Sequence, residues 1–170
     1  MFKNKKVSII LPCYNEGLNV KKAINDFFKI DVVDEVIAVD NNSSDKTDLE
    51  IKKTNAKYFF EKQQGYGFAI RRGLNESTGY YIIVVEPDGS FEAKEVLKFL
   101  DYNCDVVLGT RTNSAYIKEG AKMDWFLRIG NKFISFLVNI LFKARISDVG
   151  CTFKLITKPA LSKIASFKIG

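Results

Sequence analysis

The fold is decided by the stretch YYIIVVEPDGS, residues 80–90. Residues 80–86 are almost entirely apolar, which is typical of a strand in the middle of a parallel sheet with both faces covered. The run ends in Glu86 and Asp88, which flank a proline and are followed by a glycine. The stretch therefore predicts a buried strand that places two carboxylates at one edge of a sheet.

Strand and helix signals alternate on both sides of this run. Further strands are predicted at residues 7–11 (stopped by Pro12), 35–40, 57–60, 106–109 and 153–157. Helices are predicted at residues 18–28, from a cap at Ser44 or Asp45 to about 53, and at 68–75, 93–100, 125–142 and 158–165. This order predicts an α/β fold, a three-layer α/β/α sandwich with a mostly parallel sheet. We expect residues 1–170 to form a single domain, C-terminally truncated because no closing element follows the last helix.

Composition narrows the function classes. The net charge of +6 suits a phosphate-rich ligand or an anionic membrane surface, but no basic run is dense enough to predict a nucleic-acid partner. The absence of histidine excludes histidine-based catalytic triads and the usual zinc sites. Three widely spaced cysteines favour a reducing cytosol, so we expect a cytoplasmic protein. The longest apolar segment, residues 133–142, is too short to cross a bilayer.

Ligands of open parallel sheets bind at the carboxyl ends of the strands. The residues with useful chemistry at these ends are Pro12, Tyr14, Glu16, Asp40, Glu86, Asp88, Ser90 and Arg111. Tyr14 can stack on a nucleobase or simply cover the sheet end, and Asp40 can bind a base or ribose or form an Asx-turn. Arg111 can clamp a diphosphate or lie in solvent.

Glu86 and Asp88 are the sharpest chemical feature. Two carboxylates one residue apart can hold a hard divalent cation, Mg²⁺ or Mn²⁺, with substrate phosphates completing the coordination. The alternative is an ordinary Pro-Asp-Gly turn; the other polar residues at the same rim favour the metal site. The glycine turn at residues 64–67 is no dinucleotide fingerprint, because Ile70 stands where a third small residue is needed.

Together these motifs resemble the family 2 glycosyltransferases of the GT-A (nucleotide-diphospho-sugar transferase) fold, and most closely the dolichyl- and polyprenyl-phosphate sugar transferases. The resemblance is carried, in the family's order, by VSIILPCYNEGLNV, EVIAVDNNSSDKT, QQGYGFAIRRGLNESTGYYIIVVEPDGSF, DVVLGTRT and SDVGCTFKLITKPAL.

The resemblance implies a role for each matching position. The nucleotide pocket is lined by Pro12, Tyr14, Glu16 and Asp40. Glu86 and Asp88 stand for the DxD metal motif, with Asp88 the stronger ligand and catalytically essential. Ser90 and Arg111 lie near the donor phosphates and sugar, and Asp148 lies near the acceptor.

Three positions depart from the family pattern. Glu86 replaces the first Asp and is longer by a methylene. Thr152 stands where Gly is usual, and Lys154 stands where Arg is usual. Lysine keeps the charge of arginine but loses its bidentate fork of donors, which weakens the acceptor-side contact.

The implied reaction is inverting transfer of a sugar from a UDP- or GDP-sugar to a polyprenyl phosphate, in the synthesis of cell-envelope glycans. A phosphate acceptor is largely ionised at neutral pH, since its second pKa is about 6, and it needs no strong base. Transfer to a glycan hydroxyl is the alternative, with Asp148 as catalytic base. A nucleotidyltransferase is a rival, although residues 12–16 are acidic and glycine-poor where that class needs a basic glycine-rich loop.

The predicted helix at residues 125–142 has more apolar residues than one buried stripe requires. Basic residues flank them, a pattern expected of a helix lying on an anionic bilayer at the cytoplasmic face. The alternatives are packing on the sheet or an oligomer contact.

Overall fold

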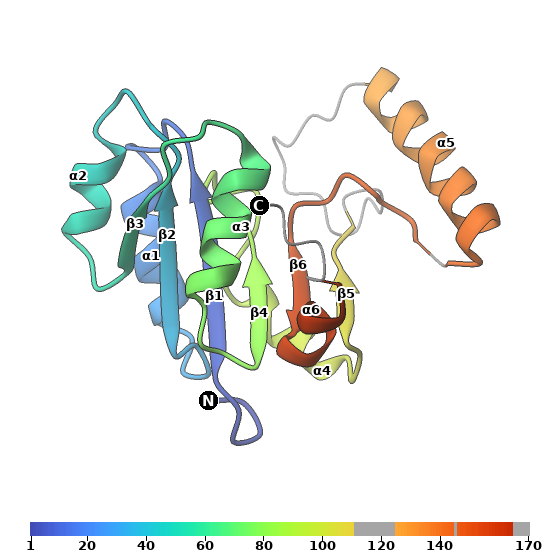
Figure 1. Ribbon diagram of the computed structural model, residues 1–170, viewed down its shortest axis with the longest axis horizontal. Helices are drawn as coiled ribbons and strands as arrows, with labels where there is room; N and C mark the ends of the chain where they lie inside the picture. The colour runs from blue at the N-terminus through green and yellow to red at the C-terminus, as the bar shows by residue number, and fades with distance from the viewer. Residues whose placement is uncertain (111–124, 145, 165–170) are drawn as a thin grey trace.

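The computed structural model describes residues 1–110, 125–144 and 146–164, with side chains from Ile129 onward in the second range. The strands in this part of the chain are β1 (Val7–Cys13), β2 (Glu35–Asp40), β3 (Lys57–Phe60), β4 (Tyr81–Val84), β5 (Val106–Leu108) and β6 (Lys154–Thr157) (Figure 1). The helices are α1 (Val20–Phe28), α2 (Thr47–Lys52), α3 (Tyr66–Glu76), α4 (Glu95–Asp101), α5 (Trp125–Phe142) and α6 (Lys158–Ile164).

The strands form one sheet in the order β3-β2-β1-β4-β6-β5. Strands β1 to β4 are parallel, whereas β6 is antiparallel to both of its neighbours. The chain moves outward from β1 to β3, and α3 then returns it to β4 on the other side of β1. The strand order thus reverses between β1 and β4, which is where open α/β sheets bind their ligands.

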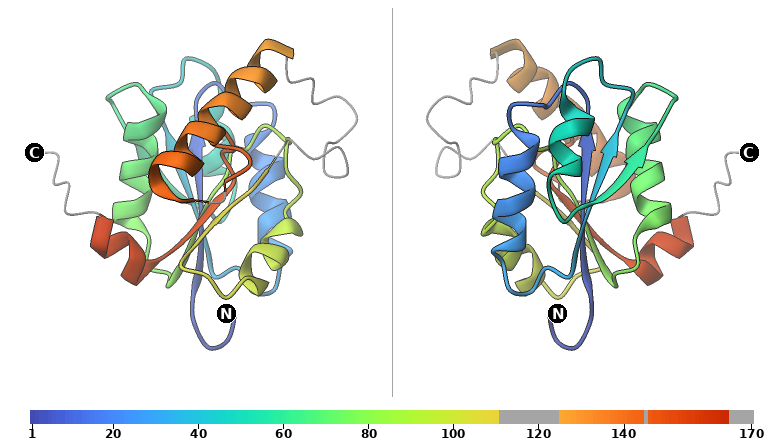
Figure 2. Two further views of the ribbon diagram at one scale, coloured as in Figure 1. Left: turned by 90° about the vertical axis from the view of Figure 1, so that its right-hand side faces the viewer. Right: turned by 90° about the vertical axis from the view of Figure 1, so that its left-hand side faces the viewer.

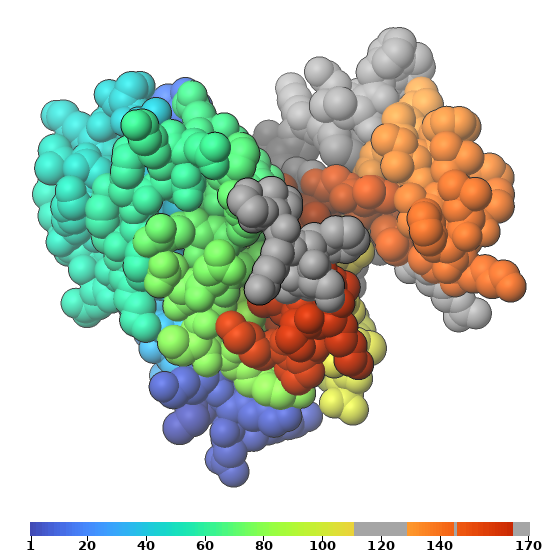
Figure 3. All heavy atoms as spheres, in the orientation of Figure 1, coloured from blue at the N-terminus to red at the C-terminus, as the bar shows by residue number. Residues whose placement is uncertain are grey.

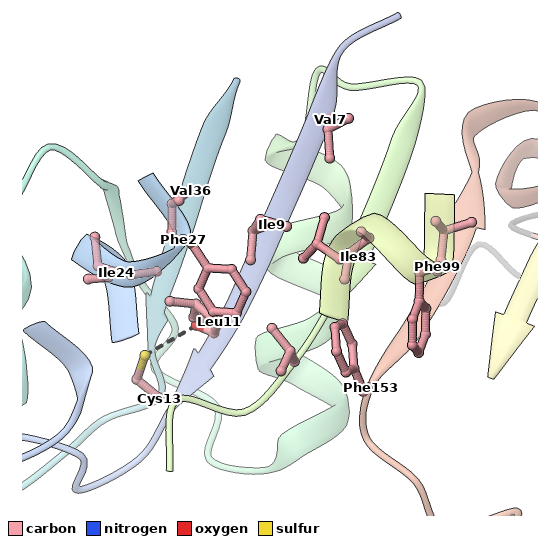
Figure 4. Close-up of a cluster of buried hydrophobic side chains, with 14 of the residues drawn as sticks. Val7, Ile9, Leu11, Cys13, Ile24, Phe27, Val36, Ile83, Phe99 and Phe153 are labelled. Carbon is pink, nitrogen blue, oxygen red and sulfur yellow. Dashed lines mark hydrogen bonds between the residues drawn. The ribbon is translucent and has the colours of Figure 1, made fainter. Parts of the chain in front are cut away.

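Helices cover both faces of the sheet, so the predicted three-layer sandwich is confirmed (Figure 2). The larger hydrophobic core lies under α1 and α4 and includes Ile9, Leu11, Ile24, Phe27 and Phe99 (Figure 4). The second core lies under α3 and α6 and includes Ile10, Ile37, Ile82, Ala69 and Leu161. The apolar run of residues 80–86 contributes Ile82 to one core and Ile83 to the other, which accounts for its lack of alternation.

Helix α3 lies unusually close to β1. Gly73 faces Ile10, and a methyl group at position 73 would overlap the Ile10 side chain. At its other end α3 is preceded by Gly65, whose φ of 143° and ψ of 135° suit only glycine. Because Gly65 ends the turn, α3 begins at Tyr66 and not at Phe68, where the sequence pattern placed it.

Pro12 does not stop β1, and this prediction was wrong. The strand continues to Cys13, with Pro12 opposite Val39 of β2. The backbone of Ile10 faces β4, since its carbonyl accepts a hydrogen bond from Val85 N–H at 3.1 Å. The backbone groups of successive residues in a strand face opposite sides, so the nitrogen of Pro12 also faces β4. It lies beyond Val84, the last β4 residue that pairs with β1. The missing N–H of Pro12 therefore costs no hydrogen bond of the sheet.

A buried polar network closes the amino end of the sheet. The carboxylate of Glu35 accepts hydrogen bonds from the Ser8 hydroxyl and from the backbone and hydroxyl of Thr78, and it pairs with Lys57. Burial alone would raise the pKa of Glu35, but the hydrogen bonds from Lys57, Ser8 and Thr78 outweigh it and bring the pKa to about 2. The network therefore ties β1 and β2 to the chain entering β4.

Candidate active site

The loops that follow β1 and β2 are joined by hydrogen bonds. The backbone N–H of Asn15 donates to Ser43 Oγ at 3.0 Å, and Asn15 Oδ1 accepts from Ser44 N–H at 2.9 Å. Gly17 N–H donates to Asp45 Oδ2 at 2.9 Å. Asp45 also accepts from the backbone N–H of Thr47, the first residue of α2, but the N-cap position is held by Lys46 and not by Ser44 or Asp45 as predicted. The two loops form a single unit at the carboxyl edge of the sheet.

Asp40 lies at the base of this unit. It is opposite Cys13 in the sheet, and only 3% of it is exposed. One carboxylate oxygen accepts from Ser43 N–H at 3.1 Å, three residues on and not two as in an Asx-turn, and the other accepts from the Tyr58 hydroxyl at 3.5 Å. Burial raises the pKa of the Cys13 thiol, and the charges of Asp40 and Glu16 raise it further, so this cysteine is an inert part of the core.

The predicted nucleotide-pocket residues lie together at this rim with different exposures. Pro12 is buried and Glu16 is half-buried, whereas 51% of Tyr14 is exposed. Glu16 Oε2 accepts a hydrogen bond from Asn19 Nδ2 at 3.1 Å. Tyr14 thus presents its ring at the surface next to the buried Asp40, an arrangement that suits stacking by the first residue and hydrogen bonding by the second.

The segment after β4 forms the other side of the reversal point. Asp88 is exposed, and its two carboxylate oxygens accept from Ser90 N–H at 2.8 Å and from Ser90 Oγ at 2.7 Å. Glu86 is half-buried and lines a cleft of about 370 Å³ between this segment and α1. The Pro-Asp-Gly turn that was the alternative to a metal site is therefore present. It holds the Asp88 carboxylate at the carboxyl edge of the sheet.

Glu86 and Asp88 carry the carboxylate oxygens that a hard divalent cation prefers. The described residues contain no group of three or more histidine, cysteine, aspartate or glutamate side chains that could hold a metal by themselves. Glu86 and Asp88 would therefore supply part of the coordination, with phosphate oxygens and water supplying the rest, as is usual for Mg²⁺.

Asp148 lies in the segment between α5 and β6, and only 2% of it is exposed. Its Oδ1 accepts hydrogen bonds from Asn131 Nδ2 at 2.8 Å and from Gly150 N–H at 3.0 Å. Asn139, two turns along α5, exchanges two hydrogen bonds with the backbone of Ile146, at 2.8 and 2.9 Å. Asp148 is thus one of the residues that attach α5. Arg111, the predicted donor-phosphate residue, lies outside the described residues.

Helix α5 turns its polar side inward. Asn131 and Asn139 bind residues 146–149, and Ser135 between them is buried. The exposed side is apolar and comprises Ile129, Phe133, Ile134, Phe136, Leu137, Ile140, Leu141 and Phe142. Figures 1 and 3 show α5 at the side of the molecule, away from the other helices. Among the described residues, no helix is long and apolar enough to span a bilayer.

Sequence patterns assigned no role to four asparagines, which hold the loops after β1 and β2 and attach helix α5. Asn15, Asn41 and Asn131 bind residues 17 to 28 positions away along the chain, and Asn139 binds Ile146, seven positions away. The available signal for Asn131 and Asn139 was their position in an otherwise apolar helix. For Asn15 and Asn41 it was their position directly after a strand.

Residues 8–165 match the family model described as glycosyl transferase family 2. The chain belongs to this family. Two uncharacterised glycosyltransferases, from Mycobacterium tuberculosis and Mycobacterium bovis, are each 28% identical to this family 2 chain over 146 residues. The match covers 84% of the chain but 64% of each relative, so the chain spans slightly less than two thirds of their length.

Solved structures share the family 2 fold seen here. Glucosyl-3-phosphoglycerate synthase from M. tuberculosis, in complex with Mn²⁺ and UDP-glucose, superposes with a TM-score of 0.71 at 17% identity, covering 92% of this chain and 57% of that one. Its complex with Mn²⁺, UDP and phosphoglyceric acid gives 0.70 at 16% identity, with the same coverage. These similarities confirm the GT-A fold.

Proposed function

We propose that this chain is the catalytic domain of an inverting, metal-dependent glycosyltransferase. Its donor is a UDP- or GDP-linked sugar, and its acceptor is a polyprenyl phosphate at the cytoplasmic face of a membrane. One observation carries the proposal. Residues suited to binding a nucleotide and a turn with two carboxylates lie on the two sides of the point where the strand order reverses. Tyr14 and Asp40 lie on the first side, and Glu86 and Asp88 lie on the second.

The residues divide the work of the reaction between them. Tyr14 stacks on the base, and Asp40 accepts hydrogen bonds from the base or ribose. A divalent cation held by Glu86 and Asp88 would offset the negative charge that develops on the departing diphosphate. Ser90 keeps the Asp88 carboxylate in one orientation through its two hydrogen bonds. Direct attack by the acceptor on the face opposite the leaving group inverts the anomeric centre.

The surroundings of Asp148 favour a phosphate acceptor. A glycan hydroxyl needs a base to accept its proton, whereas the hydrogen bonds from Asn131 and Gly150 use Asp148 to attach α5. A phosphate needs no such base, because it is already largely ionised at neutral pH.

The exposed side of α5 supports a lipid acceptor and contact with an anionic bilayer. The apolar side chains on this side are strongly exposed to solvent: Phe133 is 60% exposed and Leu141 is 71% exposed. Helix α5 contains no acidic residue, and Lys132 and Lys143 are exposed at its surface and end. Apolar residues beside lysines, without acids, are the composition of a helix lying in the interface of an anionic membrane.

A donor and acceptor matrix tests the reaction. UDP- and GDP-sugars are supplied with Mn²⁺ or Mg²⁺, and the acceptors are a polyprenyl phosphate, 3-phosphoglycerate and an oligosaccharide. The proposal expects product with the polyprenyl phosphate and none in excess chelator. Product with 3-phosphoglycerate or the oligosaccharide alone would refute the lipid acceptor but keep glycosyl transfer. Transfer of the nucleotidyl group would refute the reaction itself.

Sedimentation with liposomes tests the membrane contact. Binding should rise with the fraction of anionic lipid, fall at high salt and fall when Lys132 and Lys143 are changed to Gln. Phe133→Ser combined with Ile140→Ser should abolish it. Leu49→Ser is the matched control, because Leu49 is 52% exposed on α2, on the opposite side of the molecule (Figure 1). Equal binding by all variants, or none by the unmodified chain, would contradict the contact.

A further inference from the structure

We propose that Asn41 is a positioning residue that sets the nucleotide selectivity of the site through the loop of residues 61–65. The inference rests on the proposed function, because it takes the rim around Tyr14 and Asp40 as the nucleotide pocket. Asn41 itself is only 3% exposed, so its side chain is closed off from a ligand on the rim. Its effect is exerted through the loop that it holds.

The Asn41 side chain is committed to this loop. Its Nδ2 donates to the Gln63 carbonyl at 2.7 Å and to the Glu61 carbonyl at 3.3 Å, and its Oδ1 accepts from Gly65 N–H at 2.7 Å. The backbone N–H of Asn41 donates to the Cys13 carbonyl at 2.8 Å. One buried residue thus connects the end of β1, the end of β2 and the loop before α3.

The loop lies beside the predicted base contact. Asp40 is opposite Phe60, the last residue of β3, and its carbonyl accepts a hydrogen bond from Glu61 N–H at 2.9 Å. Residues 61–65 therefore continue along the same rim, on the side of Asp40 away from β1. Gln63 and Gln64 are exposed there, and their amides can both donate to and accept from the polar edge of a base.

Only an amide can make all three contacts at position 41. An aspartate there still accepts from Gly65, but it has no donor for the carbonyls of Gln63 and Glu61 and repels both. Asn41→Asp therefore removes the loop's attachment at nearly constant volume. Gly65→Ala disturbs the same loop independently, because alanine is strained at a φ of 143° and its methyl group would press on Phe68.

The test is calorimetric titration of the whole chain with UDP and with GDP, in the presence of Mn²⁺. Asn41→Asp and Gly65→Ala should each weaken the preferred nucleotide about tenfold and the other less than about threefold, so that the ratio of the two dissociation constants collapses. With the nucleotide sugar as substrate, KM should rise while kcat changes less. The matched control is Asn55→Asp, which makes the same substitution at an exposed site before β3, at the opposite edge of the sheet.

Three outcomes would overturn the inference. If the unmodified chain binds nucleotide and both variants keep its affinity and selectivity, Asn41 has no positioning role. If both nucleotides weaken equally and the melting temperature falls, the role is purely structural. If the unmodified chain binds neither UDP nor GDP, the proposed function fails and this inference fails with it.

Discussion

The rim at the ends of β1, β2 and β3 and the segment that carries α5 are attached to the molecule in opposite ways. At the rim, buried side chains such as Asp40 and Asn41 hold the loops from below, and the exposed residues are mostly polar. On α5, the polar residues Asn131 and Asn139 make the attachment and the apolar residues face outward.

This difference separates two tasks. A rim whose loops are already joined by hydrogen bonds would lose little conformational entropy on binding the proposed nucleotide. An apolar helix face gains stability only when something apolar covers it. The first region is therefore built to be complete before its ligand arrives, and the second to be completed by what it meets.

The largest effect is expected at the carboxylate turn after β4, which borders the rim. Asp88→Ala should lower kcat by about 10²–10³-fold, the usual cost of removing one group that offsets transition-state charge. Glu86→Ala should be milder. Asp88 is exposed, so the melting temperature should hold. The matched control is Asp101→Ala, an exposed carboxylate at the end of α4. Full activity of Asp88→Ala would contradict the metal assignment.

The next effect concerns the acid stability of the half that carries the rim. The folded pKa of Glu35 is about 2, below its ordinary value of 4.5. A lowered pKa stabilises the fold above the unfolded pKa, and that contribution, about 3 kcal/mol, is lost as the pH falls from 4.5 through 2. Glu35→Gln should therefore be less stable than the unmodified chain at pH 7, and the difference should shrink across this window. Urea unfolding at a series of pH values measures it, and a constant difference would refute the assignment.

Tyr14→Ala probes the exposed part of the rim. Loss of a stacking face should weaken nucleotide binding by about 1–3 kcal/mol, judged from aromatic stacking on bases in single-strand binders. Tyr14 is 51% exposed, so stability should be almost unchanged. Calorimetry measures the affinity, and Tyr102→Ala, at a 63% exposed tyrosine beyond α4, is the control. Equal affinity of Tyr14→Ala and the unmodified chain would place the base elsewhere.

The smallest effects belong to α5, and they sharpen the contrast between its two sides. Asn139→Ala removes both hydrogen bonds to Ile146 and should cost about 1–2 kcal/mol. Leu141→Ser, on the exposed side, should change stability by less than about 0.5 kcal/mol. Hydrogen exchange of α5 amides and chemical denaturation distinguish the two. A larger loss from Leu141→Ser would mean that this side is covered in the free protein.

The sequence predicted the architecture because its signals were local and repeated. The apolar run of residues 80–86 and the alternation around it were enough for a three-layer sandwich. Pro12 was misread, because the cost of its missing N–H depends on where β4 stops pairing, a property of the sheet and not of the strand. The antiparallel direction of β6 has the same origin, since no local pattern records which way a returning strand runs.

The candidate site was predictable as far as its positions follow strand ends. That rule brought Tyr14, Asp40 and Asp88 to one edge. It could not reveal what Asn41 does, because the partners of its amide are backbone groups 20 to 24 residues away. It also could not show that Asp148 is buried against Asn131, which depends on how α5 folds back.

The contact between Gly73 and Ile10 has a consequence for the evolution of such sites. Helix α3 starts directly after the loop of residues 61–65 and contacts β1 at its eighth residue, Gly73. A larger residue at position 73 would push α3 away from Ile10 of β1 and tilt its first turn, together with the adjacent loop of residues 61–65. The position of this loop, which borders the proposed nucleotide site, can therefore be changed by a buried residue inside the core.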